Sequence, residues 1–377
     1  DHPRNLSFIP AAPTEESSFF DLVVGASSVY GGTWLEGAGA VFAENQALRW
    51  LADLAGFPQA AGGVFVQGGT LGNLSALVTA RHAAEARRGA RPPRWVVACS
   101  ADAHSSVDHA ARVMDVDVLK VASDDQGRLT GERLREALLA RGTDDVFAVF
   151  ATGGTTNYGV VDDLAGIAEV CAELDLWMHV DGAYGLAALA APSVRHLFAG
   201  IEHADSFIVD PHKWLFAPFD ACALLYRDPA EARITHTQQA EYLDVCQIRG
   251  EWNPSDYAHH LTRRARGIPF WFGLVTYGTD AIAAAIEYTV QLAYTTARLV
   301  EEAPHLELVI EPELSVVMVR RPGWGPAQYQ EWTDRILAAG LGYVTPTGWN
   351  GETITRFCFV NPTTTVDDVR RLLASME

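Results

Sequence analysis

Lys213 is the residue whose surroundings first call for a chemical explanation. It stands between His212 and Trp214 in the apolar run IVDPHKWLFAPFDACALLY, which spans residues 208–226. Burying an ammonium group without a partner is costly, so lysine is rare in such runs. One interpretation is a side chain that reaches solvent from the end of a strand. The other is an amine kept dry so that it is neutral and nucleophilic, as in lysines that form Schiff bases.

A carboxylate ends the strand-like run LWMHVD at residues 176–181. In open α/β sheets, ligands bind outside the carboxyl ends of the strands, which is where Asp181 would lie. Its charge could pair with a cationic ring nitrogen, and the small Ala183 would leave room for a flat ring. A turn or helix-capping aspartate is the alternative interpretation.

Two further features could bind or act on a ligand. The stretch QGGT at residues 67–70 opens directly into an amphipathic helical pattern. Such a turn presents backbone N–H groups where a phosphate binds well. An ordinary glycine turn capped by Thr70 is the alternative. His104 follows the strand-like run at 95–100 and could stack on a planar ligand or transfer protons, or it could be a loop histidine without a role.

One cofactor would use all of these features together. Pyridoxal phosphate needs a lysine for its aldehyde, a carboxylate for its ring nitrogen and an anion cradle for its phosphate. Asp181 and Lys213 follow two neighbouring strand candidates, so both are expected at the same edge of a sheet. The combination predicts pyridoxal phosphate as cofactor and Lys213 as its anchor.

The elements that must position these residues follow from the alternation of apolar runs and helical patterns. Strand-like runs lie at residues 95–100, 116–122, 146–152, 176–181, 206–210 and 221–226. Helical patterns at 130–141 and 163–175 stand between them. This alternation predicts a mainly parallel sheet that is covered on both faces.

The pattern divides the chain into three parts. Residues 1–45 are rich in small residues and weakly periodic, and we expect an N-terminal arm there. Residues 46–280 are predicted to form the large domain, which includes a polar segment at 229–267 that we expect to be an extended loop. A helical pattern at 268–303 predicts one or two long helices. Residues 281–377 alternate short strands with helices, which is typical of a small α+β domain.

Composition excludes several other classes of protein. The net charge of −19 over 377 residues argues against general binding of nucleic acid or anionic membranes. Five cysteines without a CxxC pair indicate reduced thiols, as in the cytoplasm. No apolar run has transmembrane length and no signal-peptide layout is present, although the abrupt start DHPRNLSFIP suggests a preceding piece. The twelve histidines include no HExxH spacing, and no metal site is predicted.

A set of longer motifs is distributed over nearly the whole chain. They are HPRNLSFIP, GGTLGNLSAL, DAHSSVDHAARV, ATGGTTNYGVVDDL, WMHVDGAYG, HADSFIVDPHKWL, RRARGIPFWF and ITRFCFVNP. With them the sequence resembles the group II pyridoxal-phosphate-dependent amino-acid decarboxylases, which include aromatic-amino-acid, histidine and glutamate decarboxylases. The resemblance implies fold type I, with a mainly parallel seven-stranded sheet in the large domain and a small C-terminal α+β domain. It also implies a homodimer with the active site at the subunit interface.

The resemblance further implies a role for each matching residue. Lys213 would bind the cofactor aldehyde, Asp181 the ring nitrogen, and Ala183 and His104 the two faces of the ring. Further cofactor contacts are implied for Gly68, Gly69, Thr70, Thr156, Asp210 and His212. The N-terminal arm would help to form the dimer and the substrate pocket, for which the candidates are Phe8, Pro10, Trp34, Glu36 and Arg356. An acid at Glu36 would suit a substrate with a donor or cation, and pairing with a basic residue or solvent is the alternative.

The implied reaction is decarboxylation of an L-amino acid to its amine and CO2, through an external aldimine and a quinonoid. An aldehyde synthase, or another lyase or transaminase-type reaction on the same fold, is the alternative. Tyr257, in the polar segment 242–267, is the candidate proton donor to Cα. A structural role for Tyr257 is the alternative, in which case His104 or Tyr242 would serve.

Overall fold

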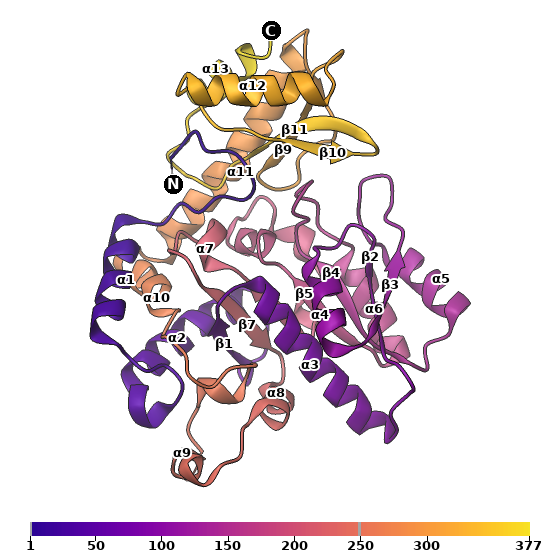
Figure 1. The fold of residues 1–377 in the computed structure, drawn as a ribbon, viewed down its shortest axis with the longest axis vertical. Helices are drawn as coiled ribbons and strands as arrows, with labels where there is room; N and C mark the ends of the chain where they lie inside the picture. The colour runs from indigo at the N-terminus through magenta and orange to yellow at the C-terminus, as the bar shows by residue number, and fades with distance from the viewer. Residues whose placement is uncertain (1, 248–249) are drawn as a thin grey trace.

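The computed structural model describes residues 2–247 and 250–377. In this part of the chain the strands form two sheets, one of seven strands in the order β1-β7-β6-β5-β4-β2-β3 and one of four in the order β10-β11-β9-β8. The small sheet and its helices lie at one end of the molecule, at the top of Figure 1. None of the helices in the described ranges is both long and apolar enough to cross a membrane.

The large sheet is parallel except at one strand. Its members are β1 (Gly62–Val66), β2 (Val96–Ser100), β3 (Asp117–Val121), β4 (Val146–Thr152), β5 (Trp177–Asp181), β6 (Ser206–Val209) and β7 (Cys222–Tyr226). β7 runs antiparallel to both of its neighbours, β1 and β6. Because β1 and β6 are both antiparallel to β7, they run in the same direction as each other. The carboxyl ends of β1, β2, β4, β5 and β6 therefore meet at one edge.

Helices pack on both faces of this sheet. Those of the large unit are α1 (Glu15–Ser27), α2 (Trp34–Leu54), α3 (Gly69–Arg88), α4 (Ser106–Met114), α5 (Gly131–Arg141), α6 (Leu164–Leu174), α7 (Pro211–Trp214), α8 (Pro229–His236), α9 (Asp244–Gln247) and α10 (Ile268–Tyr277). Short 3-10 turns are η1 (Gly185–Ala190), η2 (Arg195–Phe198), η3 (Ile201–His203), η4 (Glu241–Leu243) and η5 (Pro254–Asp256). The long α11 (Thr279–Glu302) leads to the small sheet.

The small sheet is antiparallel and is covered by two helices. Its strands are β8 (Glu307–Leu308), β9 (Val316–Arg320), β10 (Pro346–Trp349) and β11 (Glu352–Cys358), and its helices are α12 (Pro326–Ala338) and α13 (Val366–Ala374). The first residues of the chain join this unit, because the backbone of Leu6 bonds to Tyr343 and Cys358.

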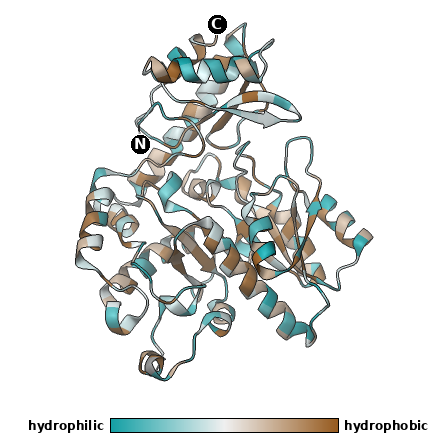
Figure 2. Ribbon diagram, viewed as in Figure 1, coloured by the Kyte–Doolittle hydropathy of each residue, from teal (hydrophilic) through white to brown (hydrophobic). Residues whose placement is uncertain are grey.

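Both faces of the sheet are buried, because the side chains on each face pack into a separate hydrophobic core. In β4, Val149 and Ala151 belong to a core with α2, α5, α6 and α10, whereas Ala148 and Phe150 belong to one with α3, α4 and α8. This follows from the period of two along a strand. Figure 2 shows the central strands of this sheet mostly in brown, the hydrophobic end of its scale. The prediction of a parallel sheet covered on both faces is confirmed.

The structure gives detail to three of the sequence-based elements. Residues 1–45, predicted as an arm, contain α1 and most of α2. The polar segment at 229–267 is not wholly extended, because it contains α8 and short turns. The pattern at 268–303 forms two helices that meet at Gly278, whose φ of 80° suits glycine. The domain limits at 45 and 280 stay predictions; α2 runs through the first and α11 begins beside the second.

Candidate active site

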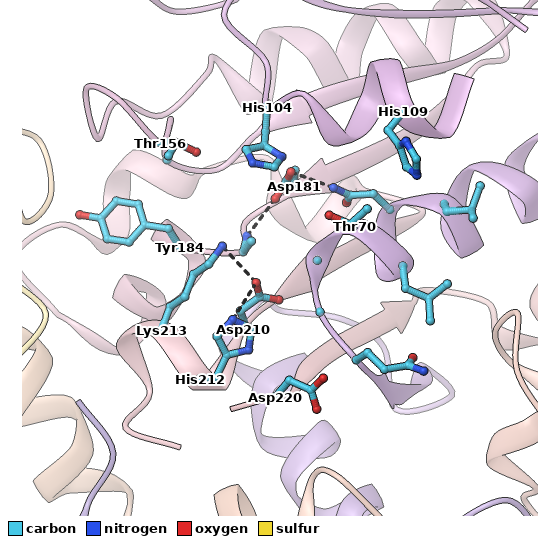
Figure 3. A pocket seen from close by; sticks show the side chains of 18 of the residues that line it. Thr70, His104, His109, Thr156, Asp181, Tyr184, Asp210, His212, Lys213 and Asp220 are labelled. Carbon is cyan, nitrogen blue, oxygen red and sulfur yellow. Dashed lines mark hydrogen bonds and ion pairs between the residues drawn. The ribbon is translucent and has the colours of Figure 1, made fainter. Parts of the chain in front are cut away.

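A cavity of about 540 Å³ opens at the carboxyl edge of the large sheet (Figure 3). Its lining comes from the loops and helix ends that follow β1, β2, β4, β5 and β6. All ten residues predicted to contact a cofactor line it: Gly68, Gly69, Thr70, His104, Thr156, Asp181, Ala183, Asp210, His212 and Lys213. The fold therefore brings together side chains that are far apart in the sequence.

Lys213 lies in α7, directly after β6, and points into the cavity. Its Nζ is 3.0 Å from Oδ2 of Asp210, and its side chain is 27% exposed. Burial alone would lower the pKa of this ammonium, but the carboxylates of Asp210 and Asp181 outweigh burial and raise the pKa above its ordinary value. Lys213 is thus held as a charged partner, not as the neutral amine suggested by its apolar surroundings in the sequence.

Asp181 is the last residue of β5 and is buried. Its Oδ1 accepts a hydrogen bond from the backbone N–H of Ala183 at 3.0 Å. Its Oδ2 accepts one from the side-chain amide of Asn73, on α3, at 2.9 Å. Because both partners donate, the carboxylate is held as an acceptor whose oxygens are fixed in position.

The glycine turn joins β1 to α3 and brings the start of this helix close to the other loops. A Cβ at Gly69 would lie 3.1 Å from Cδ1 of Ile208, 3.3 Å from Oδ2 of Asp210 and 3.4 Å from Cβ of Ala183. Glycine here permits the close approach. An α-helix leaves its first N–H groups without partners in the helix, and its dipole is positive at this end. The turn can therefore bind a phosphate.

His104 and the loop after β4 contribute other parts of the lining. The Nδ1 of His104 accepts a hydrogen bond from the backbone N–H of Ser106 at 3.2 Å, and Figure 3 shows its ring directed into the cavity. Thr156 lies in the loop after β4, and its carbonyl oxygen accepts a hydrogen bond from Arg356 of β11. Arg356 does not line the cavity, so it reaches the site only through this loop.

The residues present fit pyridoxal phosphate on two observations of this structure. Oγ1 of Thr152, in the lining, is buried and has no hydrogen-bond partner among the described residues. Buried polar atoms are nearly always paired, so this hydroxyl is suited to a bound group. The glycine cradle, the amine of Lys213 and the carboxylate of Asp181 match the phosphate, aldehyde and ring nitrogen of the cofactor.

Comparison with known proteins decides the family. Residues 1–321 match the model of the pyridoxal-dependent decarboxylase conserved domain. The chain belongs to this family. Its cofactor is therefore pyridoxal 5'-phosphate, and the resemblance and the fold type predicted from the sequence are confirmed.

Relatives of this chain are named for different amino-acid substrates. An aromatic-L-amino-acid decarboxylase from Bacillus atrophaeus is 29% identical and aligns with 100% of this chain and 81% of its own length. An L-2,4-diaminobutyrate decarboxylase from Rhizobium meliloti (strain 1021) is 30% identical, over 99% of this chain and 77% of its own. The structure of Oryza sativa TDC with PLP and tryptamine has a TM-score of 0.91 at 27% identity, over 99% of this chain and 83% of its own. Family membership alone therefore does not name the substrate.

Tyr257 does not line the cavity. It is 4% exposed and its ring stacks on Trp252 with centroids 4.0 Å apart. Burial raises the pKa of its phenol to about 12. This placement favours the structural alternative for Tyr257, and its role as proton donor stays a prediction. The side chain of Tyr242 lies outside the part of the chain that the structure describes.

The candidates for the substrate pocket also lie away from the cavity lining. They are Phe8, Pro10, Trp34, Glu36 and Arg356. Phe8 is 63% exposed. Glu36, in the first turn of α2, accepts a hydrogen bond from Oγ1 of Thr33 at 3.4 Å. Its side chain is exposed, which favours the alternative that it faces solvent. Contacts between these residues and a substrate stay predictions.

Several lining residues were not singled out from the sequence. They are Gln67, Leu71, Asn73, Leu74, His109, Thr152, Gly154, Tyr184, Phe219 and Asp220. Asn73 lies within the quoted motif GGTLGNLSAL, one helical turn after the glycine turn. The spacing of three residues on a helix could have indicated that it faces the same side as Thr70.

Proposed function

We propose that this chain removes CO2 from an L-amino acid and releases the corresponding amine. The observation that supports this most strongly is the single cavity in which Lys213, Asp181, His104 and the glycine turn meet. When bound, pyridoxal phosphate supplies an electron-poor ring that takes up the electron pair left by the departing CO2. The protein must bind that ring, hold the substrate in one orientation and return a proton.

Lys213 would hold the cofactor through Nζ. A charged amine is not a nucleophile, so Lys213 must lose its proton before it can attack an aldehyde. Asp210, whose Oδ2 is 3.0 Å from Nζ, lies where it can take this proton. The Nε2 of His212 is 3.6 Å from the same oxygen of Asp210. Asp210 would therefore also keep the imidazole of His212 close to Lys213.

Asp181, Ala183 and His104 would orient the ring. Asp181 would accept the hydrogen bond of the protonated ring nitrogen, because its two partners in the protein leave it an acceptor. Ala183 and His104 would contact opposite faces. Gly68, Gly69 and Thr70 would hold the phosphate at the start of α3. These contacts would fix the plane of the ring, and this plane decides which bond of the substrate is broken.

His104 is the candidate in the cavity for the proton that must return to Cα. Because its Nδ1 accepts a hydrogen bond from the backbone of Ser106, the neutral imidazole carries its proton on Nε2. That proton is available on the cavity side. Donation by a group of this kind is ordinary general acid catalysis.

We also propose that the active protein is a homodimer in which a second copy completes the site. Helices α1 and α2 carry large apolar side chains that are exposed in a single chain. They are Phe19 (67%), Leu22 (67%), Leu35 (56%) and Phe42 (55%). Phe19 and Leu22 are three residues apart on α1 and so share one face of this helix. An exposed apolar face favours association. Sedimentation velocity should show a dimer, and Phe19→Ser with Leu22→Ser should shift it toward monomer with loss of activity.

The experiment that tests the function follows the products. The holoenzyme is supplied with a panel of L-amino acids, and CO2, amine, aldehyde and hydrogen peroxide are measured. Equal amounts of CO2 and amine would support the proposal and name the substrate. Aldehyde with peroxide would show an aldehyde synthase instead, and keto acid without CO2 would show transamination.

The cofactor anchor can be tested on the same preparation. The chain has two lysines, Lys120 and Lys213. Reduction with borohydride followed by peptide mass analysis should find the cofactor on Lys213 and none on Lys120, which pairs with Asp108 at the surface. The Lys213→Ala variant should lose the visible absorption of the bound cofactor, and Lys120→Ala should keep it.

A further inference from the structure

A row of hydrogen-bonded side chains lies behind Asp181 and is sealed from solvent. Trp177, His179 and Asp181 alternate along β5, so their side chains share one face of the sheet. The Nε1 of Trp177 donates to Oγ of Ser206 at 2.9 Å, and Oγ of Ser206 is 2.8 Å from Nδ1 of His179. The Nε2 of His179 is 2.9 Å from Oδ1 of Asn73, whose amide nitrogen donates to Asp181.

The direction of the protons in this row follows from the Asp181 end and from the neutral charge of His179. The indole of Trp177 can only donate, so the Ser206 hydroxyl accepts there, and its own proton is free to point toward Nδ1 of His179. At the other end Asp181 accepts from the NH2 group of Asn73. The oxygen of Asn73 therefore faces His179 and accepts from Nε2–H. Because burial keeps the imidazole neutral, a ring that donates from Nε2 has an unprotonated Nδ1, and the Ser206 hydroxyl donates there.

We propose that His179 is a positioning residue that acts through Asn73 to hold Asp181 as an acceptor for the ring nitrogen of pyridoxal phosphate. The inference rests on the proposed role of Asp181. An amide that turned over would place its carbonyl oxygen against Oδ2 of Asp181, and two facing acceptors repel unless the carboxyl is protonated. A protonated Asp181 would donate where the ring nitrogen needs an acceptor. The Nε2–H of His179 prevents this by fixing the oxygen of Asn73.

Burial makes the arrangement permanent over the working range of pH. His179 and Ser206 are 0% exposed and Asn73 is 1% exposed. Burial lowers the pKa of His179 to about 3, so the imidazole stays neutral. The amide of Asn73 makes a further hydrogen bond to Oγ of Ser106 at 2.9 Å.

The tautomer can be measured without the cofactor. Nitrogen-15 NMR of the protein with labelled histidine should show His179 as neutral and protonated at Nε2 between about pH 5 and 8. Its signals are assigned by their absence from a His179→Phe or His179→Gln variant. A tautomer protonated at Nδ1, or a charged ring in this range, would overturn the proposal.

The effect on Asp181 is tested with two cofactors. Binding of pyridoxal phosphate, and of an analogue with carbon in place of the ring nitrogen, is followed by quenching of tryptophan fluorescence. We expect His179→Phe to weaken binding of pyridoxal phosphate by about tenfold or more and to leave binding of the analogue nearly unchanged. His236→Phe is the matched control, because His236 is also a buried, hydrogen-bonded histidine; it should leave the preference for pyridoxal phosphate intact.

A third variant separates failure of this inference from failure of the role of Asp181. Asp181→Asn should also abolish the preference for pyridoxal phosphate over the analogue. If it does not, the role of Asp181 is wrong. If Asp181→Asn abolishes the preference but His179→Phe weakens the binding of pyridoxal phosphate and of the analogue equally, the role of Asp181 stands. The positioning by His179 is then refuted.

Discussion

A buried ion pair joins α2 to the segment that leads into α10, and its loss should be costly. The side chains of Glu44 and Arg263 are each 2% exposed, and their two hydrogen bonds are 2.7 and 2.8 Å long. Oε1 of Glu44 also accepts from the backbone N–H of Gly267 at 2.8 Å. Replacing Glu44 by glutamine keeps the shape and an oxygen for Gly267 but leaves the guanidinium of Arg263 without a counter-charge.

The magnitude follows from the geometry of the pair. Removing one partner of a buried pair costs about 3–5 kcal/mol. Glutamine still offers an oxygen to one donor, so we expect the lower end of this range, about 3 kcal/mol. Unfolding entropy of about 2.1 cal/mol/K per residue over 377 residues then corresponds to a fall in Tm of about 4 °C.

A double-mutant cycle measured by urea denaturation tests this reasoning. The double variant Glu44→Gln, Arg263→Met contains no unpaired charge, so it should lose about 2 kcal/mol less than the sum of the single losses. The control is the surface pair of Arg141 and Asp145, 33% and 32% exposed, where Asp145→Asn should cost less than about 1 kcal/mol. Additive losses at Glu44 and Arg263, or a Glu44→Gln loss no larger than that of the control, would refute the argument.

Three further predictions concern pH, packing and thiol chemistry. Burial lowers the pKa of His236 from 6.5 to about 4, so the native state binds fewer protons than the unfolded state in that window and loses stability as the pH falls through it. The stability deficit of His236→Gln relative to the wild type should therefore shrink from about pH 6.5 to 4 in urea melts, and a constant deficit would contradict this. A Cβ at Gly185 would lie 2.2 Å from the carbonyl oxygen of Gly153, so Gly185→Ala should displace the loop that carries Thr156. We expect cofactor binding to weaken about tenfold in a fluorescence titration. An unchanged affinity would show that the loop does not depend on this contact. Burial raises the pKa of Cys99 to about 12 and that of Cys358 to about 11, so an aromatic disulfide should modify these thiols only after unfolding, and rapid labelling of the native protein would disprove their inertness.

Most of the large sheet could be predicted because its strands are continuous apolar runs. The run at 146–152 coincides with β4, and the other five strand-like runs end within two residues of the observed strands. β1 was not predicted because it begins with two glycines, which are unfavourable in strands. The structure explains them: a Cβ at Gly63 would lie 1.9 Å from the carbonyl oxygen of Leu224 on β7. The need for glycine at this position arises from the pairing of β1 with β7, which is distant in the sequence. The residues around Gly63 alone therefore do not reveal it.

The site residues that follow directly from a strand end could be predicted from the sequence. Asp181 and Lys213 stand out because each polar residue interrupts an apolar run. The charge of Lys213 was not predictable, because it depends on two carboxylates that only the fold places near the amine. The link from Asp181 through Asn73 to His179 was missed for a similar reason, since it joins α3 to β5 and depends on the register between them.

The position of β1 at the edge of the sheet has a consequence for the order of assembly. β1 is made early in synthesis, but the strand beside it, β7, is made long after it. Strands β2 to β6 can pair with one another before β7 is available to pair with β1. Pairing between strands that are far apart in the sequence, such as β1 and β7, forms slowly. Lys213 and Asp181 can thus take their places before the glycine turn does. A nascent chain would hold the lysine and the aspartate of the site without its phosphate cradle, so tight capture of the cofactor should come only once the whole sheet has closed.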